Sequence, residues 1–150
     1  MEKRHITRSH NKTRLVYHFV CPIKYRRDVL ADGVAQTLKE ICLEIQARFD
    51  IHFLEIGTDD DHVHFLIQSI PTASPSSIIQ NIKSNLGREL FKQRPEIKRM
   101  LWGGKFWSAG FYANTVGEHT EDVIRKYVHD QGKRYQRHYQ GQPTLFDGVA

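Results

Sequence analysis

The chain has 150 residues, of which 39% are hydrophobic and 26% are charged, a balance typical of one globular domain with its own core. Its formal net charge of +5 favours a polyanionic partner, most simply nucleic acid. No stretch approaches the roughly 18 apolar residues of a membrane span, and the polar start lacks the apolar segment of a signal peptide. We therefore expect a cytoplasmic protein without a membrane partner.

The N-terminal part predicts an arm followed by a central strand. Residues 1–12 are polar and basic, and we expect them to form a mobile arm. Residues 15–21 are apolar on both faces except at His18, which is typical of a strand in the middle of a sheet. Pro22 ends this strand.

A first helix is predicted over residues 32–49, where Asp32 can cap the N-terminus and apolar residues recur at helical spacing. The only two cysteines are Cys21 in the strand and Cys42 in this helix, and both fall in apolar periodic segments. We therefore expect two buried thiols in a reducing compartment rather than a disulfide or a metal-binding pair.

Residues 51–58 and 62–69 predict two adjacent strands joined by the acidic turn at residues 59–61. In the second strand, His62 and His64 point to one face, while the apolar residues that alternate with them point to the other. Because the apolar face needs a core, the two imidazoles lie on the opposite face, in a geometry that suits one shared metal ion. Two solvated histidines on a half-exposed strand would show the same pattern, so the pair alone decides nothing.

The rest of the chain predicts a second helix, a loop, a strand and a last helix. The second helix covers residues 76–91 and contains Gly87, which costs about 1 kcal/mol relative to Ala unless something approaches closely there. Residues 95–105 predict a basic loop, and the aromatic stretch 106–115 predicts a fourth strand. The last helix is predicted from about residue 120 at least to residue 131, with acidic residues at its positive end.

These elements occur in the order βαββαβ followed by α, which predicts an α+β, ferredoxin-like fold with an antiparallel sheet. We expect residues 1–150 to form a single domain, with residues 141–150 as a tail that has no core pattern. The strands that carry His18 and the histidine pair are then central. The first two helices cover one face of the sheet, and the last helix lies across the face with the imidazoles.

The last helix places further chemical groups on one stripe. Tyr127 and Gln131 are four residues apart, so a phenol and an amide oxygen arrive together beside the histidine pair if this stripe faces the sheet. Gln131 could then be a third, oxygen ligand, and such a donor set tolerates Mg²⁺ or Mn²⁺ as well as Zn²⁺. A half-buried tyrosine and a solvent-exposed glutamine explain the spacing more simply when it is taken alone.

Several segments together resemble a known family. His62-Val63-His64 after the acidic turn is similar to the HUH motif, in which U is a bulky apolar residue. Residues 123–131, VIRKYVHDQ, resemble the tyrosine helix of the small single-tyrosine, TnpA-like transposases of the simplest bacterial insertion sequences. Residues 101–107 and 111–117 resemble the segment that precedes this helix in the family, and the likeness extends over about residues 13–131.

The resemblance implies an enzyme that transposes single-stranded DNA. By position in the motifs, Tyr127 becomes the nucleophile that forms a 5′-phosphotyrosine. The implied ligands of Mg²⁺ or Mn²⁺ are His62, His64 and Gln131, with Asp59 as an alternative ligand. Members of this family act as homodimers, in which the tyrosine can meet the histidine pair of the other subunit, and they bind imperfect hairpins. No nucleotide cofactor is expected, because one phosphodiester is exchanged for another.

DNA binding is expected to rest on basic side chains and aromatic stacking. The candidates are Arg14, Lys24, Arg26, Arg27, Lys83, Arg88, Lys98, Arg99, Trp102 and Lys105. Each basic residue could instead be a solvated surface charge, and Trp102 could be a loop anchor. Three other functions stay open: a ferredoxin-like RNA-binding module, a metal-dependent hydrolase in which water attacks, and a domesticated relative that binds and cleaves hairpins without moving an element.

Overall fold

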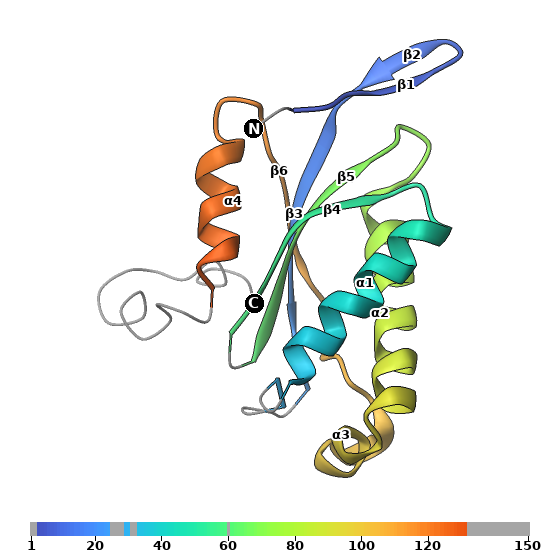
Figure 1. Ribbon diagram of the computed structural model, residues 1–150, viewed down its shortest axis with the longest axis vertical. Helices are drawn as coiled ribbons and strands as arrows, with labels where there is room; N and C mark the ends of the chain where they lie inside the picture. Colours follow the sequence, from blue (N-terminus) through green and yellow to red (C-terminus); the bar gives the residue numbers. More distant parts are fainter. Residues whose placement is uncertain (1–2, 25–28, 31–32, 60, 132–150) are drawn as a thin grey trace.

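The computed structural model describes residues 3–24, 29–30, 33–59 and 61–131 (Figure 1). Its main feature is a four-stranded antiparallel sheet with the strand order β4-β5-β3-β6. The strands are β3 (Leu15–Pro22), β4 (His52–Thr58), β5 (His62–Ser69) and β6 (Tyr112–Thr115). The predicted α+β fold, with β3 and β5 in the centre of the sheet, is confirmed.

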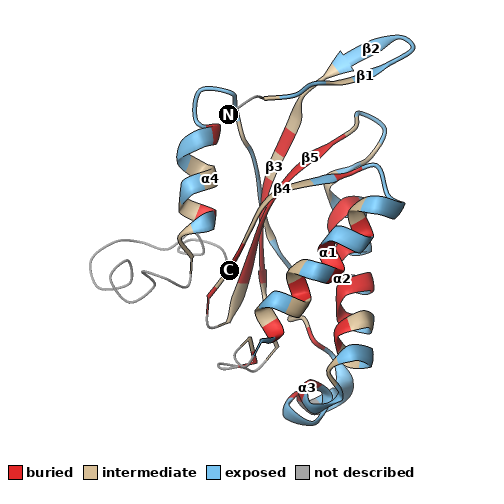
Figure 2. Ribbon diagram, in the orientation of Figure 1, coloured by how far each residue is buried: buried red, intermediate tan, exposed pale blue. Residues whose placement is uncertain are grey.

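Two long helices cover one face of the sheet and a shorter helix lies on the other. α1 (Val34–Arg48) and α2 (Pro75–Gln93) pack on one side, and α4 (Glu121–His129) stands on the opposite side (Figure 1). Buried residues concentrate on the two central strands and the inner sides of α1 and α2 (Figure 2). This core includes Phe19, Leu38, Ile41, Val63, Phe65, Ile67, Leu86 and Leu90. Among the described residues, no helix is both long and apolar enough to cross a membrane.

The segment predicted as an arm, residues 1–12, contains a hairpin that the sequence analysis did not predict. β1 (Ile6–Arg8) pairs with β2 (Asn11–Thr13) around a two-residue turn. The carbonyl oxygen of Arg4 accepts hydrogen bonds from Arg14 Nη1 at 2.6 Å and from Gln68 Nε2 at 2.8 Å, which ties this segment to the sheet. Both strands are polar and mostly exposed, so no hydrophobic alternation indicates them in the sequence.

The predicted loop at residues 95–105 contains a short helix. α3 (Pro95–Met100) begins with a proline, which suits the first position of a helix, and Ile97 anchors it in the core. A single 3₁₀ turn, η1 (Trp102–Gly104), follows it. The prediction missed this helix because six residues are too few to show helical periodicity.

The predicted strand at residues 106–115 is shorter than expected. Its second half forms β6 on β3, while before Gly110, whose φ of 86° interrupts the extended backbone, only an isolated antiparallel bridge joins Trp107 to Ile23 just beyond the end of β3. Before this point, Trp107 packs against α2 and its Nε1 donates a hydrogen bond to the Lys83 carbonyl at 2.9 Å. The indole atoms lie 3.6 Å from the place of a Cβ on Gly87, which is an ordinary contact distance, so this packing does not require a glycine inside the helix.

Three helices, α1, α2 and α4, have ends that differ from the prediction. α1 begins after Gly33, which takes a φ of 85° at the N-cap, and the predicted cap Asp32 lies outside the described residues. α2 begins and ends slightly outside the predicted range, and the Ser74 side chain caps it. α4 does not reach Gln131, because the Gln131 N–H donates to the Val128 carbonyl at 3.2 Å and tightens the last turn.

Candidate active site

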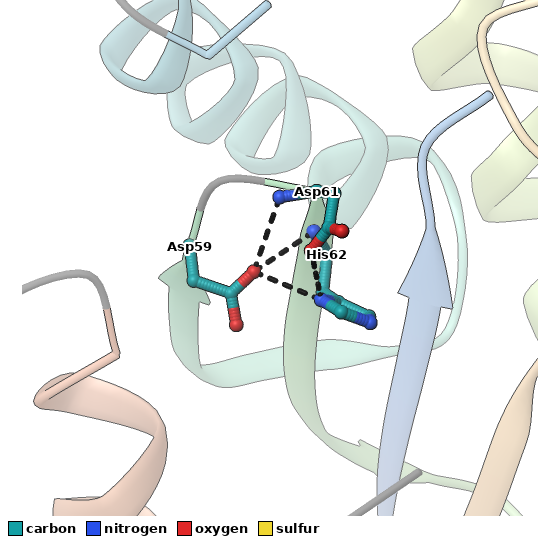
Figure 3. Close-up of side chains that lie close together, drawn as sticks. All are labelled: Asp59, Asp61 and His62. Carbon is teal, nitrogen blue, oxygen red and sulfur yellow. Dashed lines mark hydrogen bonds and ion pairs between the residues drawn. The ribbon is translucent and has the colours of Figure 1, made fainter. Parts of the chain in front are cut away.

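The acidic turn between β4 and β5 is organised by the side chain of Asp59. Its Oδ1 accepts hydrogen bonds from the backbone N–H groups of Asp61 at 3.3 Å and His62 at 2.9 Å, an arrangement that closes the turn locally. The same oxygen lies 3.0 Å from His62 Nδ1, and the Asp61 carboxylate contacts this nitrogen as well (Figure 3). The turn therefore directs two carboxylates at the first histidine of β5.

Asp59 also reaches the second histidine of the pair. Its Oδ2 lies 3.4 Å from His64 Nε2, so one buried carboxylate joins both imidazoles. Burial alone would raise the pKa of Asp59, but the hydrogen bonds and charges of His62 and His64 outweigh it and lower the pKa to about 2. Burial likewise lowers the pKa of His62, yet Asp59 and Asp61 outweigh burial there and raise it above the usual value.

These side chains form a donor set that fits a divalent cation. Ligand atoms of Asp59, Asp61 and His62 all lie within 4.8 Å of one another, and His64 adjoins this group through Asp59. Carboxylate oxygens and imidazole nitrogens together suit first-row divalent transition metals such as Mn²⁺, and they tolerate Mg²⁺. The predicted ligands His62, His64 and Asp59 are thus brought together. Asp61 was not assigned from the sequence, although its position directly before the first histidine was a usable signal.

Tyr127 lies against the histidines of its own chain. Its ring centroid is 5.8 Å from that of His64, and the two rings meet edge to face at 75°. This contact depends on a close approach of α4 to β4, because a Cβ on Gly57 would lie only 1.8 Å from the Val128 carbonyl oxygen. The phenol ring and the acidic, imidazole-rich turn therefore face the same side of the sheet, under α4.

Gln131 lies just beyond α4 and beside the sheet. Its Cβ is 3.1 Å from the place of a Cβ on Gly57, and Gly57 is the register partner of His64. Its side-chain Nε2 donates to the Tyr127 carbonyl at 3.2 Å. The glutamine is therefore near the second histidine, with its amide nitrogen engaged by the end of the helix.

His18 is a further member of this cluster that the sequence did not assign to the site. It is 2% exposed, and its Nε2 lies 3.3 Å from His64 Nδ1. Its ring centroid lies 5.6 Å from that of His64, with the two rings stacked, and 6.3 Å from that of Tyr127, with the two rings edge to face. Burial, followed by the charge of His64, lowers the pKa of His18 to about 3, so this imidazole is neutral at pH 7. A single polar residue in an otherwise apolar strand was the available signal.

Arg14 was a predicted DNA contact, and the structure places it in a buried ion pair with Glu121. Its Nη2 lies 2.6 Å from both carboxylate oxygens of Glu121, and Nε adds a third contact at 3.2 Å. The side chains are 5% and 2% exposed. Since Glu121 is the first residue of α4, this pair fixes the start of the tyrosine helix to the junction of β2 and β3.

The other predicted DNA contacts fall into two described groups. One group lines an open cavity of about 930 Å³ between α2 and residues 104–111, and it consists of Lys24, Lys83, Arg88 and Lys105. Four aromatic rings line the same cavity, those of Phe91, Phe106, Trp107 and Phe111. The second group, Lys98 and Arg99, is exposed on α3. Arg26, Arg27 and the side chain of Trp102 lie outside the described part of the structure.

Comparison with solved structures finds the same architecture in two transposases. A crystal structure of a candidate transposase from Deinococcus radiodurans superposes with a TM-score of 0.67 and 30% identity, covering 85% of this chain and 97% of the other. A REP-associated tyrosine transposase bound to a REP hairpin gives a TM-score of 0.59, covering 87% of this chain and 74% of the other. At 12% identity, the second likeness concerns the fold alone.

Comparison of sequences leads to the same family. The chain is 33% identical over 118 residues to the ISDra2 transposase TnpA of Deinococcus radiodurans, covering 79% of this chain and 84% of the relative. It is 26% identical over 140 residues to the IS200 transposase of Salmonella typhimurium, covering 90% and 92% of the two chains. Residues 11–131 match the family described as "Transposase IS200 like". With its fold and its tyrosine–histidine cluster, this chain belongs to the IS200-like transposases.

Proposed function

We propose that this transposase cleaves and rejoins single-stranded DNA through a covalent bond to Tyr127. The observation that carries the proposal is the packing of the Tyr127 ring against His64, beside a partly buried group of carboxylates and imidazoles. A nucleophile adjacent to a site for a divalent cation is an arrangement that supports phosphoryl transfer. A phosphotyrosine intermediate is itself a phosphodiester, so it would keep the bond energy between cleavage and rejoining.

The reaction balances without an external energy source. The Tyr127 oxygen attacks the scissile phosphorus while the bond from phosphorus to the 3′ oxygen breaks, which leaves a 5′-phosphotyrosine and a free 3′-hydroxyl. An unperturbed tyrosine has a pKa of about 10 and is protonated at neutral pH, so the phenol loses a proton during the attack and the leaving 3′ oxygen gains one, with no net change in protons. A second 3′-hydroxyl then attacks the same phosphorus, rejoins the DNA and returns the proton to Tyr127.

The metal site supports this reaction electrostatically. We assign Asp59, Asp61, His62 and His64 as the residues that would hold Mg²⁺ or Mn²⁺, with Gln131 as an additional oxygen ligand. A divalent cation there would polarise the scissile phosphate and stabilise the charge of the transition state. The hydrogen bonds from the backbone to Asp59 fix the turn beforehand, so the donor atoms need little rearrangement.

We propose imperfect hairpins of single-stranded DNA as the substrate and a homodimer as the active form. The basic cavity beside α2 combines four cationic side chains with aromatic rings, which suits phosphates together with unstacked bases. The REP hairpin bound to one structural neighbour supports a hairpin ligand. The cavity adjoins α2, on the side of the sheet away from α4, so hairpin binding and strand cleavage use separate surfaces.

The test is an incubation with single-stranded hairpin DNA and Mg²⁺ or Mn²⁺, followed by a search for an SDS-resistant protein–DNA adduct. We expect the adduct with the wild type and with the control Tyr17→Phe, because Tyr17 packs against the core on the other face of the sheet. Tyr127→Phe should form none. An adduct with Tyr127→Phe would refute the nucleophile, cleavage without an adduct would favour attack by water, and binding without cleavage would favour a nucleic-acid-binding module.

A further inference from the structure

His18 occupies a position where an apolar residue would be expected. It lies on β3 between Val16 and Val20, whose side chains point to the same face and are buried. Burial of an imidazole is unfavourable unless its nitrogens find partners. The partner shown for His18 is the second histidine of the metal site, since its Nε2 lies 3.3 Å from His64 Nδ1.

The contact between the two rings determines which nitrogen of His64 carries a hydrogen. Between two neutral imidazoles, one nitrogen must donate and the other must accept. If His64 Nδ1–H donates to His18, then His64 Nε2 keeps a free lone pair on the side of Asp59, where the distance to Oδ2 is 3.4 Å. If His18 donates instead, His64 Nε2 carries the hydrogen and cannot bind a cation.

We propose that His18 is a positioning residue that holds His64 in the tautomer able to bind a divalent cation. His18 Nε2 accepts the hydrogen bond from His64 Nδ1–H, and the stacked rings, 5.6 Å apart and inclined by 24°, fix the orientation of His64. Partners of this kind on the second nitrogen of a ligating histidine set its tautomer and raise its basicity. The inference rests on the metal site proposed above and adds a residue that contacts neither the cation nor the DNA.

The aromatic surroundings of His18 allow a selective test. Its ring also meets Tyr127 and Tyr112 edge to face, with centroid distances of 6.3 Å and 6.1 Å. His18→Phe keeps a ring in this place and removes both nitrogens. His18→Gln gives up the ring but offers an amide oxygen that can accept a hydrogen bond. The control His52→Phe removes an exposed histidine on β4.

The first measurement is the affinity for Mn²⁺ without DNA, determined by calorimetry on the four proteins, with thermal unfolding as a check of folding. We expect His18→Phe to bind Mn²⁺ roughly 10- to 100-fold more weakly than the wild type. His18→Gln should recover most of this loss, and His52→Phe should bind like the wild type. Equal affinity of the folded His18→Phe protein would overturn the role of His18 alone. Failure of the wild type to bind Mn²⁺ would overturn the proposed metal site as well.

The second measurement needs no variant at position 18. Long-range ¹⁵N–¹H NMR of the wild-type protein with Mg²⁺, with the imidazole signals assigned by a His64→Ala spectrum, reports which ring nitrogen is protonated. We expect the hydrogen on Nδ1 of His64. A hydrogen on Nε2 would contradict the proposal, even if no variant at position 18 folded.

Discussion

The ion pair between Arg14 and Glu121 is predicted to hold the tyrosine helix on the sheet. Both side chains are almost fully buried, and the guanidinium contacts both carboxylate oxygens at 2.6 Å. Glu121→Ala would leave Arg14 buried without its counter-charge, which typically costs about 3–5 kcal/mol. Alanine is the best helix former, so helix propensity does not contribute to this loss.

The loss is expected to appear first as undocking of α4. No residue of α4 belongs to the main core cluster, so the helix can separate while α1, α2 and the sheet stay packed. Hydrogen exchange of the α4 amides should accelerate on the order of 10²- to 10⁴-fold, up to the limit set by global unfolding, while the amides of β3 change much less.

The control for this experiment is Asp122→Ala, the next residue of the same first turn. Asp122 is 75% exposed and pairs with Lys3 at 3.5 Å on the surface, where such pairs are worth about 0–1 kcal/mol. Asp122 carries the same negative charge near the N-terminus of α4, so Asp122→Ala measures the loss of the interaction with the helix dipole without the loss of the buried pair. Equal exchange rates in the two variants would refute the argument that the buried pair docks the helix.

Three further predictions follow from the packing of single residues. Gly57→Ala should abolish adduct formation while the core stays folded, because its Cβ would lie 1.8 Å from the Val128 carbonyl and push α4 away; a normal yield of adduct would contradict this. Gly87→Ala should stabilise the protein by up to about 1 kcal/mol in urea denaturation, because its Cβ meets Trp107 only at an ordinary contact distance of 3.6 Å, and a lower midpoint would show a clash. Both cysteine thiols are fully buried and burial raises their pKa, so they should react with a thiol reagent only in denaturant; rapid labelling of the native protein would contradict the packing.

The sequence predicted the parts of the site that follow from strand and helix periodicity. The alternation of β5 placed His62 and His64 on the face away from α1 and α2, because the residues between them had to be buried. The order of the elements left one helix for that face, which brought Tyr127 to the histidines. These inferences needed no knowledge of individual contacts, only of which face an apolar pattern buries.

The parts that the sequence did not predict depend on contacts between distant segments. The pairing of His18 with His64 arises from the register of β3 on β5, where Val20 faces His64 and His18 faces Leu66. A strand pattern does not specify that register. The partnership of Arg14 with Glu121 likewise joins residues far apart in the chain, and a basic residue in a basic protein carries no sign of burial.

The same contacts bear on whether the tyrosine helix can serve a second subunit. In the described chain, α4 is held at its start by Arg14, at the junction of β2 and β3, and at its end by the close contact with Gly57 on β4, so neither partner belongs to the helix. A helix transferred to an identical sheet would meet the same arginine and the same glycine there. A symmetric exchange between two subunits therefore conserves both contacts in its end states, and the buried ion pair opposes only the passage between them. In the homodimer that we propose, the contacts that hold Tyr127 beside its own histidines would therefore form equally well in a swapped arrangement, and any exchange of α4 between subunits would require the Arg14–Glu121 pair to break.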